Sequence, residues 1–410
     1  MRILLHAWGS RGDVQPMTAL GCGLADRGHH VAIAAARDFE DMIAAYGLDY
    51  EPIDASVADL STSAAGRDWL GGQAATQRQE LRAMQDFFAA AAPPIAQMLI
   101  RTSGYDHTVT TPFLLESALT LGRHSLTVAM LQPDFTTSDG RSTIAALHPG
   151  KSLVNRFAGH IYEQATRRFF ASFAEATCRL SDRPRMSFRD YHSRKATIPH
   201  LLASSPAITP LPADNRLNAT ATGFWQHHTP EDFIPPEPLA DFLESGPPPI
   251  YVGFGSMSSH DAATTAHLIT DALRICGLRA VVHRGAADLD VANDMVLSVG
   301  SIPHSWLLPR VSAAVHHGGA GTTASAIVAG IPQVVIPHMG DQPFWGRRMH
   351  ELGVAPPPIP RKGLDAAVLA AAMTATRDQD MRGRAARLGA VVAAEDGVSI
   401  AIAVLESRWG

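Results

Sequence analysis

An apolar strand that leads through a Gly-rich loop into a helix occurs twice in this chain, once at the N-terminus and once after residue 249. In the first copy, a strand at 2–7 precedes the loop Gly9-Ser10-Arg11-Gly12-Asp13, a helix from about Val14 and a second strand at 30–35. A strand–helix–strand unit pairs its strands in parallel, and a parallel sheet is covered by helices on both faces. The start of the chain therefore predicts a doubly wound α/β domain.

The second copy has a strand at 250–254, a Gly/Ser loop at 253–259 and a helix at 261–275. Further apolar strands, each followed by a turn and a helical segment, are expected at 279–283, 296–299, 312–316 and 333–336. Together the halves predict two Rossmann-like α/β domains that face each other across a cleft. Their ligands are expected at the carboxyl ends of the strands.

Between the two copies, the pattern at 60–200 is mainly helical, with one strand expected near 125–131. Prolines then gather between 206 and 249, and proline stiffens a linker because it fixes φ. We expect an N-terminal domain at 1–215, a linker at 216–248, a C-terminal domain at 249–390 and a final helix within 391–410.

Composition narrows the class of protein. The 410 residues suit two domains, and the formal net charge of −5 comes without any basic block, which argues against a nucleic-acid partner. Cys22, Cys178 and Cys276 are far apart and lack zinc-ligand spacing, which indicates a reducing compartment. Neither a signal sequence nor a run of about 20 apolar residues is evident, so we expect a cytoplasmic protein without an integral membrane segment.

The segment HHGGAGTT at 316–323 follows an apolar strand and opens a helix. Consecutive glycines let backbone N–H groups approach an anion, and the helix N-terminus adds partial positive charge. We interpret His316, Gly318, Gly319, Ala320 and Gly321 as a phosphate cradle. The alternative is a Gly-rich turn without a ligand. The segment is not a dinucleotide fingerprint, because the GxGxxG spacing is absent.

The loop at 253–259 gives a weaker signal. Ser256 in it could contact phosphate, but a Gly/Ser turn between a strand and a helix is useful without any ligand.

Three acidic or amide side chains are candidates for substrate chemistry. Asp341 and Gln342 could accept and donate hydrogen bonds to vicinal sugar hydroxyls, although Asp341 could simply cap a helix ahead of Pro343. Asp13 could take the proton of an attacking hydroxyl, or cap the helix near Val14. Ser10 could touch either substrate.

No metal site is predicted. Asp288-Leu289-Asp290 could hold a divalent ion, but no His adjoins it and the segment reads as a solvated loop. The pairs His29-His30 and His227-His228 lack ligand spacing. Trp306 and Trp345 are interpreted as core or cleft-wall residues rather than stacking platforms.

Four segments resemble the signature motifs of family 1 glycosyltransferases, in the branch of the sterol glucosyltransferases and the glycopeptide-antibiotic glycosyltransferases. They are GSRGDVQP at 9–16, YVGFGSM at 251–257, HHGGAGTT at 316–323 and GDQPFW at 340–345. The resemblance implies the two-domain GT-B fold, in which the N-terminal half binds the acceptor and the C-terminal half binds a nucleotide-sugar. It also implies that the final helix crosses back to the N-terminal domain.

The resemblance further implies inverting transfer in a single displacement, without metal or cofactor. Asp13 would be the general base, and Asp341 with Gln342 would hold the sugar. The diphosphate would be held by His316 and the backbone of 318–321, with Ser256 and Ser10 assisting, and the base by Ser301 and Ile302. Two positions depart from the family. Ala324 stands where many relatives have a Glu for the ribose, and Ser301 stands where others stack a Trp, which leaves uridine and thymidine both open.

The function implied is transfer of a hexose or deoxyhexose from a UDP- or dTDP-sugar to a hydroxyl of a small lipophilic or natural-product acceptor, in antibiotic or other secondary-metabolite biosynthesis. Three alternatives stay open: a sterol or lipid glucosyltransferase, a nucleotide-sugar epimerase of the same fold, and a relative that binds without turnover.

Overall fold

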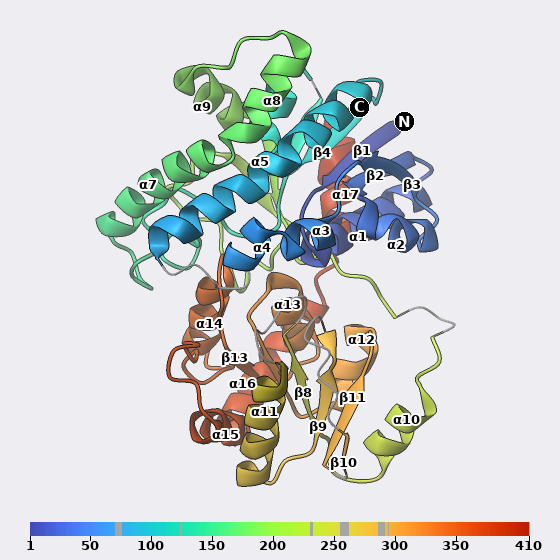
Figure 1. Cartoon of the computed structure of the whole chain (residues 1–410), viewed down its shortest axis with the longest axis vertical. Helices are drawn as coiled ribbons and strands as arrows, with labels where there is room; N and C mark the ends of the chain where they lie inside the picture. Colours follow the sequence, from blue (N-terminus) through green and yellow to red (C-terminus); the bar gives the residue numbers. More distant parts are fainter. Residues whose placement is uncertain are drawn as a thin grey trace. The chain divides into compact units, whose positions relative to one another are not determined.

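The protein is described by a computed structural model that covers residues 1–69, 76–123, 125–229, 233–254, 262–285, 292–293 and 295–409 (Figure 1). The chain divides into two compact units. Unit 1 comprises Met1–Gln226 and Asp396–Gly410, and unit 2 comprises His227–Glu395.

Unit 1 is built on a seven-stranded sheet in the order β3-β2-β1-β4-β5-β6-β7, and every neighbouring pair is parallel. The strands are β1 (Arg2–Ala7), β2 (His30–Ala36), β3 (Asp49–Ile53), β4 (His107–Thr110), β5 (Leu126–Met130), β6 (Pro199–Leu202) and β7 (Asn218–Ala221). The α-helices are α1 (Arg11–Asp26), α2 (Glu40–Ala45), α3 (Val57–Thr62), α4 (Ala64–Trp69), α5 (Gln77–Arg101), α6 (Leu115–Thr120), α7 (Leu153–Phe169), α8 (Ala171–Ser181), α9 (Phe188–Thr197) and α17 (Gly397–Trp409).

Strand β1 shows why this sheet is covered on both faces. Ile3 and Leu5 join the core formed with α1 and α17, whereas Leu4 joins the core formed with α5 and α8. Successive side chains of a strand point to opposite faces, so a strand buried on both sides needs a continuous apolar run.

The C-terminal helix α17 belongs to unit 1, where it packs on α1. Gly23 of α1 leaves room for this contact, because a Cβ there would lie 2.7 Å from side-chain atoms of both Val398 and Ile402. Ala401, Ile402 and Leu405 are buried in the core with β1 and β2.

One segment among the described residues, 379–409, has the length and apolar composition of a membrane span. In the structure it is two helices, α16 (Gln379–Ala393) and α17, separated by a short break. The second of them contributes to the core of unit 1.

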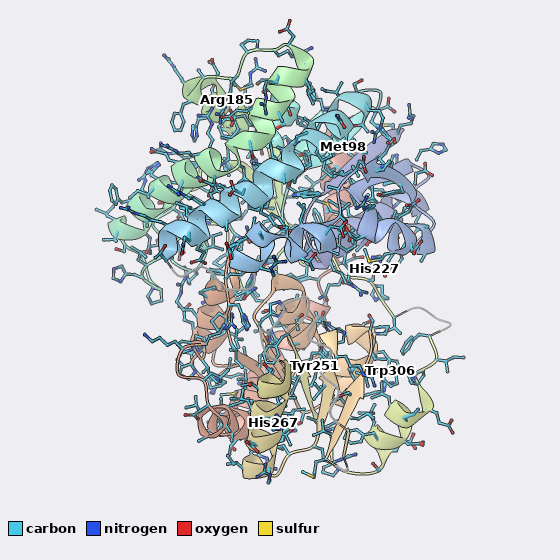
Figure 2. All side chains as sticks on the ribbon, viewed as in Figure 1. Met98, Arg185, His227, Tyr251, His267 and Trp306 are labelled. Atoms are coloured by element: carbon cyan, nitrogen blue, oxygen red, sulfur yellow. The ribbon has the colours of Figure 1, made fainter. Side chains whose placement is uncertain are left out.

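A buried ionic cluster ties α6, α7 and the segment before α9 together in unit 1. The carboxylate of Glu116 accepts hydrogen bonds from Arg167 at 2.8 and 3.1 Å, and from Arg185 at 3.1 Å (Figure 2 labels Arg185). A buried carboxylate flanked by two guanidinium groups is compensated only while both partners stay in place.

Unit 2 contains a six-stranded sheet in the order β10-β11-β9-β8-β12-β13, parallel except for β10 at one edge. The strands are β8 (Ile250–Gly253), β9 (Ala280–His283), β10 (Ala292–Asn293), β11 (Val296–Val299), β12 (Ala313–His316) and β13 (Gln333–Val335). The helices are α10 (Glu237–Glu244), α11 (Ala262–Cys276), α12 (His304–Leu307), α13 (Ala320–Val328), α14 (Gln342–Glu351), α15 (Ala366–Ala375) and α16. Alternate strand residues again enter two cores, one with α11 and α15 and one with α10 and α12.

Each strand predicted from the sequence overlaps an observed strand, and the predicted helices at 261–275 and near the C-terminus correspond to α11 and α17. The first helix begins at Arg11, earlier than the predicted Val14. Strands β3, β4, β6, β7 and β10 were not anticipated. Within 216–248, β7 extends the sheet of unit 1 and α10 belongs to unit 2.

Candidate functional site

Asp13 lies in the first turn of α1, directly after β1. Ser10 is the N-cap of this helix, and the Asp13 carboxylate accepts hydrogen bonds from its main-chain N–H at 2.7 Å and its hydroxyl at 3.1 Å. Gly9 has φ of +139°, and a Cβ there would collide with the Asp13 carboxylate. The N-cap of α1 is therefore Ser10 and not Asp13. Asp13 is the acidic partner of Ser10 in a capping box.

The environment of Asp13 raises the pKa of its carboxyl group. Burial raises the pKa of the carboxyl group to about 6, although the hydrogen bonds from Ser10 act in the opposite direction. A carboxylate that titrates this close to neutrality is a stronger proton acceptor than an ordinary aspartate, and it is still ionised at pH 7.

In unit 2, the candidate donor-binding segments meet at one edge of the sheet. Strand β12 pairs in parallel with β8 on one side, where His316 lies opposite Gly253, and with β13 on the other, where His316 lies opposite Val335. Because all three strands run in the same direction, their carboxyl ends and the loops that follow them lie next to one another.

The Gly-rich loop after β12 contacts the Asp-Gln segment after β13. Gly318 has φ of +89°, and a Cβ there would lie 2.7 Å from Val335 and 3.1 Å from the main-chain oxygen of Gln342. The first turn of α13 follows at once, and its N-cap, Gly319, makes no side-chain capping bond. The geometry thus presents a helix N-terminus without a side-chain cap at the edge of the sheet, which suits an anion.

His316 is not available for a phosphate in this arrangement, contrary to the prediction. Its ring is fully buried, Nδ1 accepts from the main-chain N–H of Gly318 at 3.0 Å, and Nε2 donates to the side-chain oxygen of Gln333 at 2.8 Å. Burial lowers the pKa of His316 to about 3, so it is neutral. Both ring nitrogens are occupied, and the residue acts as an internal brace of the glycine loop.

His317 is the histidine that sequence reasoning missed. It is half-buried, its ring lies against Gly319, and its Nδ1 has no hydrogen-bond partner. Burial lowers its pKa to about 4, with a hydrogen bond to the backbone of Gly253 acting against the shift. The ring connects the two Gly-rich loops and keeps one nitrogen for a ligand.

A second unpartnered ring nitrogen lies nearby. His338 follows β13, and its Nδ1 is buried without a partner. Burial lowers its pKa to about 4, with smaller contributions from Arg361 and from His317. Like His317, this residue carries no net charge at pH 7.

The side chains of Asp341 and Gln342 are held by their own loop. Gln342 is buried, and its side-chain oxygen accepts from the main-chain N–H groups of His338 at 2.7 Å and Met339 at 3.1 Å. The half-buried Asp341 is at the N-cap position of α14 but makes no side-chain capping bond; its carboxylate accepts from the indole N–H of Trp345 at 2.7 Å. In Gln342, whose side-chain oxygen is engaged, the amide nitrogen is the group that could bind a ligand. The Asp341 carboxylate is oriented by Trp345 and does not cap the helix.

The other predicted residues of unit 2 lie after β11, in its cores or outside the described part of the chain. Ser301 is exposed and Ile302 packs partly into the second core of unit 2, both just after β11. Ser256 lies outside the described residues, as do Asp288 and Asp290. Trp345 is fully buried, in agreement with its interpretation as a core residue. Trp306 packs in the core with α10 and α12, as also expected, and Figure 2 labels it.

A metal centre finds no support among the residues that the structure describes, where no three His, Cys, Asp or Glu side chains are grouped as ligands.

Two family models match the chain. The model described as erythromycin biosynthesis protein CIII-like, C-terminal domain, matches residues 261–400, and the glycosyltransferase family 28 N-terminal domain matches residues 3–119. The chain is 31% identical over 440 residues to O-mycaminosyltylonolide 6-deoxyallosyltransferase of Streptomyces fradiae, covering 100% of this chain and 97% of that protein. It is 28% identical to a sterol 3-beta-glucosyltransferase of Arabidopsis thaliana, covering 98% of this chain but only 64% of the plant protein.

Solved structures agree on the architecture. The glycotransferase of kitacinnamycin superposes with a TM-score of 0.70 at 16% identity, over 100% of this chain and 99% of that one. The Streptomyces sp. SF2575 glycosyltransferase SsfS6, complexed with thymidine diphosphate, superposes with a TM-score of 0.64 at 19% identity, over 98% and 99% of the two chains. The predicted fold class, two Rossmann-like α/β domains of the GT-B type, is confirmed.

Proposed function

The chain belongs to the family 1 glycosyltransferases of the GT-B fold, and on that premise we propose that it transfers a hexose or deoxyhexose from a UDP- or dTDP-sugar to a hydroxyl of a small lipophilic acceptor. The plant and fungal relatives are sterol glucosyltransferases, and the Streptomyces fradiae relative is named for a tylonolide acceptor. We place the acceptor among natural products, because that second relative matches this chain over its whole length.

The observation that carries this proposal is the order of loops along the sheet of unit 2. The segments with candidate roles follow β11 (base), β8 and β12 (diphosphate) and β13 (sugar), and the strand order is β11-β9-β8-β12-β13. The linear order of groups in a nucleotide-sugar is the same. Four strand spacings of about 4.8 Å give about 19 Å from the first loop to the last, which is comparable to an extended donor.

The leaving group would be stabilised without a metal ion. We assign the diphosphate to the backbone N–H groups of 318–321, to the N-terminus of α13 and to Nδ1 of His317, which takes the role predicted for His316. The other ring nitrogen of His317 donates to the backbone of Gly253, so Nδ1 of the neutral ring carries no proton. Nδ1 would donate once the charge of the diphosphate draws a proton onto the ring. Asp341, oriented by Trp345, would accept hydrogen bonds from sugar hydroxyls, and the amide nitrogen of Gln342 would donate one. Treatment with a chelator should leave turnover unchanged, and loss of activity that magnesium restores would contradict the metal-free assignment.

Asp13 would act as general base on the acceptor. Its carboxylate takes the hydroxyl proton while the hydroxyl oxygen attacks the anomeric carbon, and the bond from that carbon to the diphosphate oxygen breaks on the opposite face. The bonding electrons leave with the nucleotide diphosphate, so the configuration at the anomeric carbon is inverted. Ser10 serves as a positioning residue, because both hydrogen bonds that it donates go to the carboxylate that must accept the proton.

The test is turnover with defined substrates. Purified protein is incubated with a UDP-hexose or a dTDP-deoxyhexose and a panel of polyketide, peptide and sterol acceptors, and both the released nucleotide diphosphate and the anomeric configuration of the product are measured. We expect an inverted glycoside with at least one acceptor, and we expect the enzyme to work in the cytoplasm. Isomerised sugar in the absence of any acceptor would identify an epimerase, and tight nucleotide binding without turnover across the panel would contradict the proposal.

A further inference from the structure

Helix α7 of unit 1 turns its apolar side outward. Leu153, Phe157 and Ile161 are four residues apart and so share one face of the helix, and their exposed fractions are 80%, 67% and 54%. The buried residues of the same helix are Asn155 and Gly159. This is the reverse of the usual arrangement, in which the apolar stripe faces the core.

The structure also shows why the helix cannot turn that face inward. The side chain of Asn155 makes a network with the preceding loop: Oδ1 accepts from the main-chain N–H groups of Leu147 and His148, and Nδ2 donates to the carbonyls of Ser138, His148 and Gly150. Gly159 lies close to the backbone of Thr136, where a Cβ would approach to 3.1 Å. A polar clamp and a close backbone contact therefore fix the rotation of α7.

The surroundings of this apolar face are basic. Residues 147–169 contain four basic residues, of which Arg167 is paired with Glu116 at 2.8 Å, and one acidic residue, Glu163, which is paired with Lys195 at 2.7 Å. The whole chain, in contrast, carries a formal charge of −5. Lys151 and His160 are exposed next to the apolar stripe, as is Leu147 just before the helix.

The stripe continues toward the end of the helix as polar and basic side chains. Gln164 and Arg168 lie on the same face as Phe157 and Ile161, and both line an open pocket of about 940 Å³ between α5, α7 and α8. Figure 1 draws α7 at the left margin of unit 1. The pocket is lined by Arg167, Arg168 and Arg185 together with the carboxylates of Asp86 and Glu175. The apolar side chains at one end of the face suit acyl chains, and the exposed Arg168 at the other end suits an anionic headgroup.

We propose that the outward face of α7, together with Leu147, docks on the surface of a membrane that contains anionic lipids. The helix lies along the interface, its leucine, phenylalanine and isoleucine side chains enter the acyl boundary, and the basic side chains around them meet lipid phosphates. A second copy of the chain fits this face less well, because a symmetric contact would oppose two basic helices. The proposal rests on the surface of unit 1 alone and stands whether or not the proposed reaction is correct.

The experiment is sedimentation of the full chain with vesicles. We expect it to bind vesicles of phosphatidylcholine and phosphatidylglycerol in equal parts, to bind pure phosphatidylcholine more weakly, and to be released by high salt. The double substitution Leu153→Ser with Phe157→Ser should weaken binding by about tenfold or more, because two apolar side chains that would enter the acyl boundary are lost. Lys151→Glu should weaken binding to the anionic vesicles and leave the residual binding to phosphatidylcholine unchanged.

Matched controls separate this face from general surface hydrophobicity. Ile275→Ser on α11 and Leu180→Ser on α8 remove apolar side chains that are also at least half exposed, and should leave vesicle binding at the wild-type level. All these side chains are on the surface, and thermal unfolding should verify that each variant is folded. Three results would overturn the proposal: no binding of the wild type to anionic vesicles, binding that the double variant retains, or a dimer in sedimentation velocity that the double variant abolishes.

Discussion

Replacement of Asp13 by Asn tests the chemistry most directly. The substitution keeps the size of the side chain and removes the proton acceptor, so the transfer rate should fall by about 10²–10⁴-fold, the usual contribution of general-base catalysis. Nucleotide diphosphate affinity should stay at the wild-type value, because the groups that we assign to the diphosphate lie in unit 2, whereas Asp13 lies in unit 1. Transfer at the wild-type rate, with the variant folded, would refute the assignment of the base.

The pH dependence gives a second readout with a worked magnitude. With the pKa of Asp13 raised to about 6, the base is protonated in acid, and kcat/KM should fall about tenfold for each pH unit below that value. An ordinary aspartate, with a pKa of about 3.9, would leave the rate flat to about pH 5. A flat profile down to that pH would therefore contradict the raised pKa, even if Asp13 is essential.

The same shift has a consequence for stability. The folded carboxyl group holds its proton up to about pH 6 while the unfolded one loses it near pH 4, so this group makes folding less favourable as the pH rises through that window, by at most about 3 kcal/mol. Asn cannot ionise, so the free energy of unfolding of Asp13→Asn minus that of the wild type should be larger at about pH 8 than at about pH 4, which means that the variant is relatively more stable at the higher pH. Denaturant titrations at the two pH values measure the difference.

Asp13 also belongs to a capping box, and that role needs its own control. On α9, Ser187 is the N-cap and the Asp190 carboxylate accepts from its hydroxyl at 2.7 Å, so Asp190→Asn makes the same change in a similar cap. We expect Asp190→Asn to leave transfer unchanged. Ser10→Ala keeps the base but removes a hydrogen bond that lowers its pKa, so the acidic limb of the pH profile should move to higher pH. If Asp190→Asn lowers the rate as much as Asp13→Asn, the effect is structural.

Four further substitutions test other parts of the structure. His317→Ala should weaken binding of nucleotide diphosphate in calorimetry by about tenfold, because one hydrogen bond to a charged group is lost. His316→Ala should instead lower the free energy of unfolding by about 1–3 kcal/mol, because its two buried hydrogen-bond partners lose their partner. The reverse pattern would mean that His316 binds the diphosphate. Leu405→Ala should destabilise the chain by about 2–5 kcal/mol in denaturant titration, because the side chain is fully buried in the core shared with β1; a near-zero change would mean that α17 does not pack as described. Glu116→Gln should lower the free energy of unfolding by about 3–5 kcal/mol, since two arginines lose the carboxylate between them. A change below about 1 kcal/mol would mean that water compensates the two guanidinium groups.

The fold was largely readable because long parallel sheets need continuous apolar strands. Strands such as β1, β8 and β12 are buried on both faces and stand out as runs of aliphatic residues. The strands that were missed carry weaker signals: β4 reads His-Thr-Val-Thr, β6 begins with a proline, and β7 reads Asn-Ala-Thr-Ala with only partly buried side chains. Their pairing is fixed by neighbouring strands, which a local pattern does not contain.

The motifs predict the diphosphate site but do not distinguish between two adjacent histidines. His316 and His317 are adjacent in a segment where either could serve a phosphate by type. Only the fold shows that His316 turns into the sheet, where Gln333 and the N–H of Gly318 take both its nitrogens, whereas His317 turns toward Gly253 and Gly319. Successive residues at a strand end point in opposite directions, so the choice depends on which face is buried.

Helix α7 also shows that a sequence pattern does not determine which side of an element faces the core. Leu153, Phe157 and Ile161 have the spacing of an ordinary core-facing stripe, and a reading of the sequence would bury them. Asn155 reverses the outcome, because its five hydrogen bonds with the loop before the helix can form only if the polar side of α7 faces inward. Periodicity establishes which side chains share a face; which way that face points is decided by the strongest polar contacts of the helix, and here those leave an apolar surface to be covered from outside the chain.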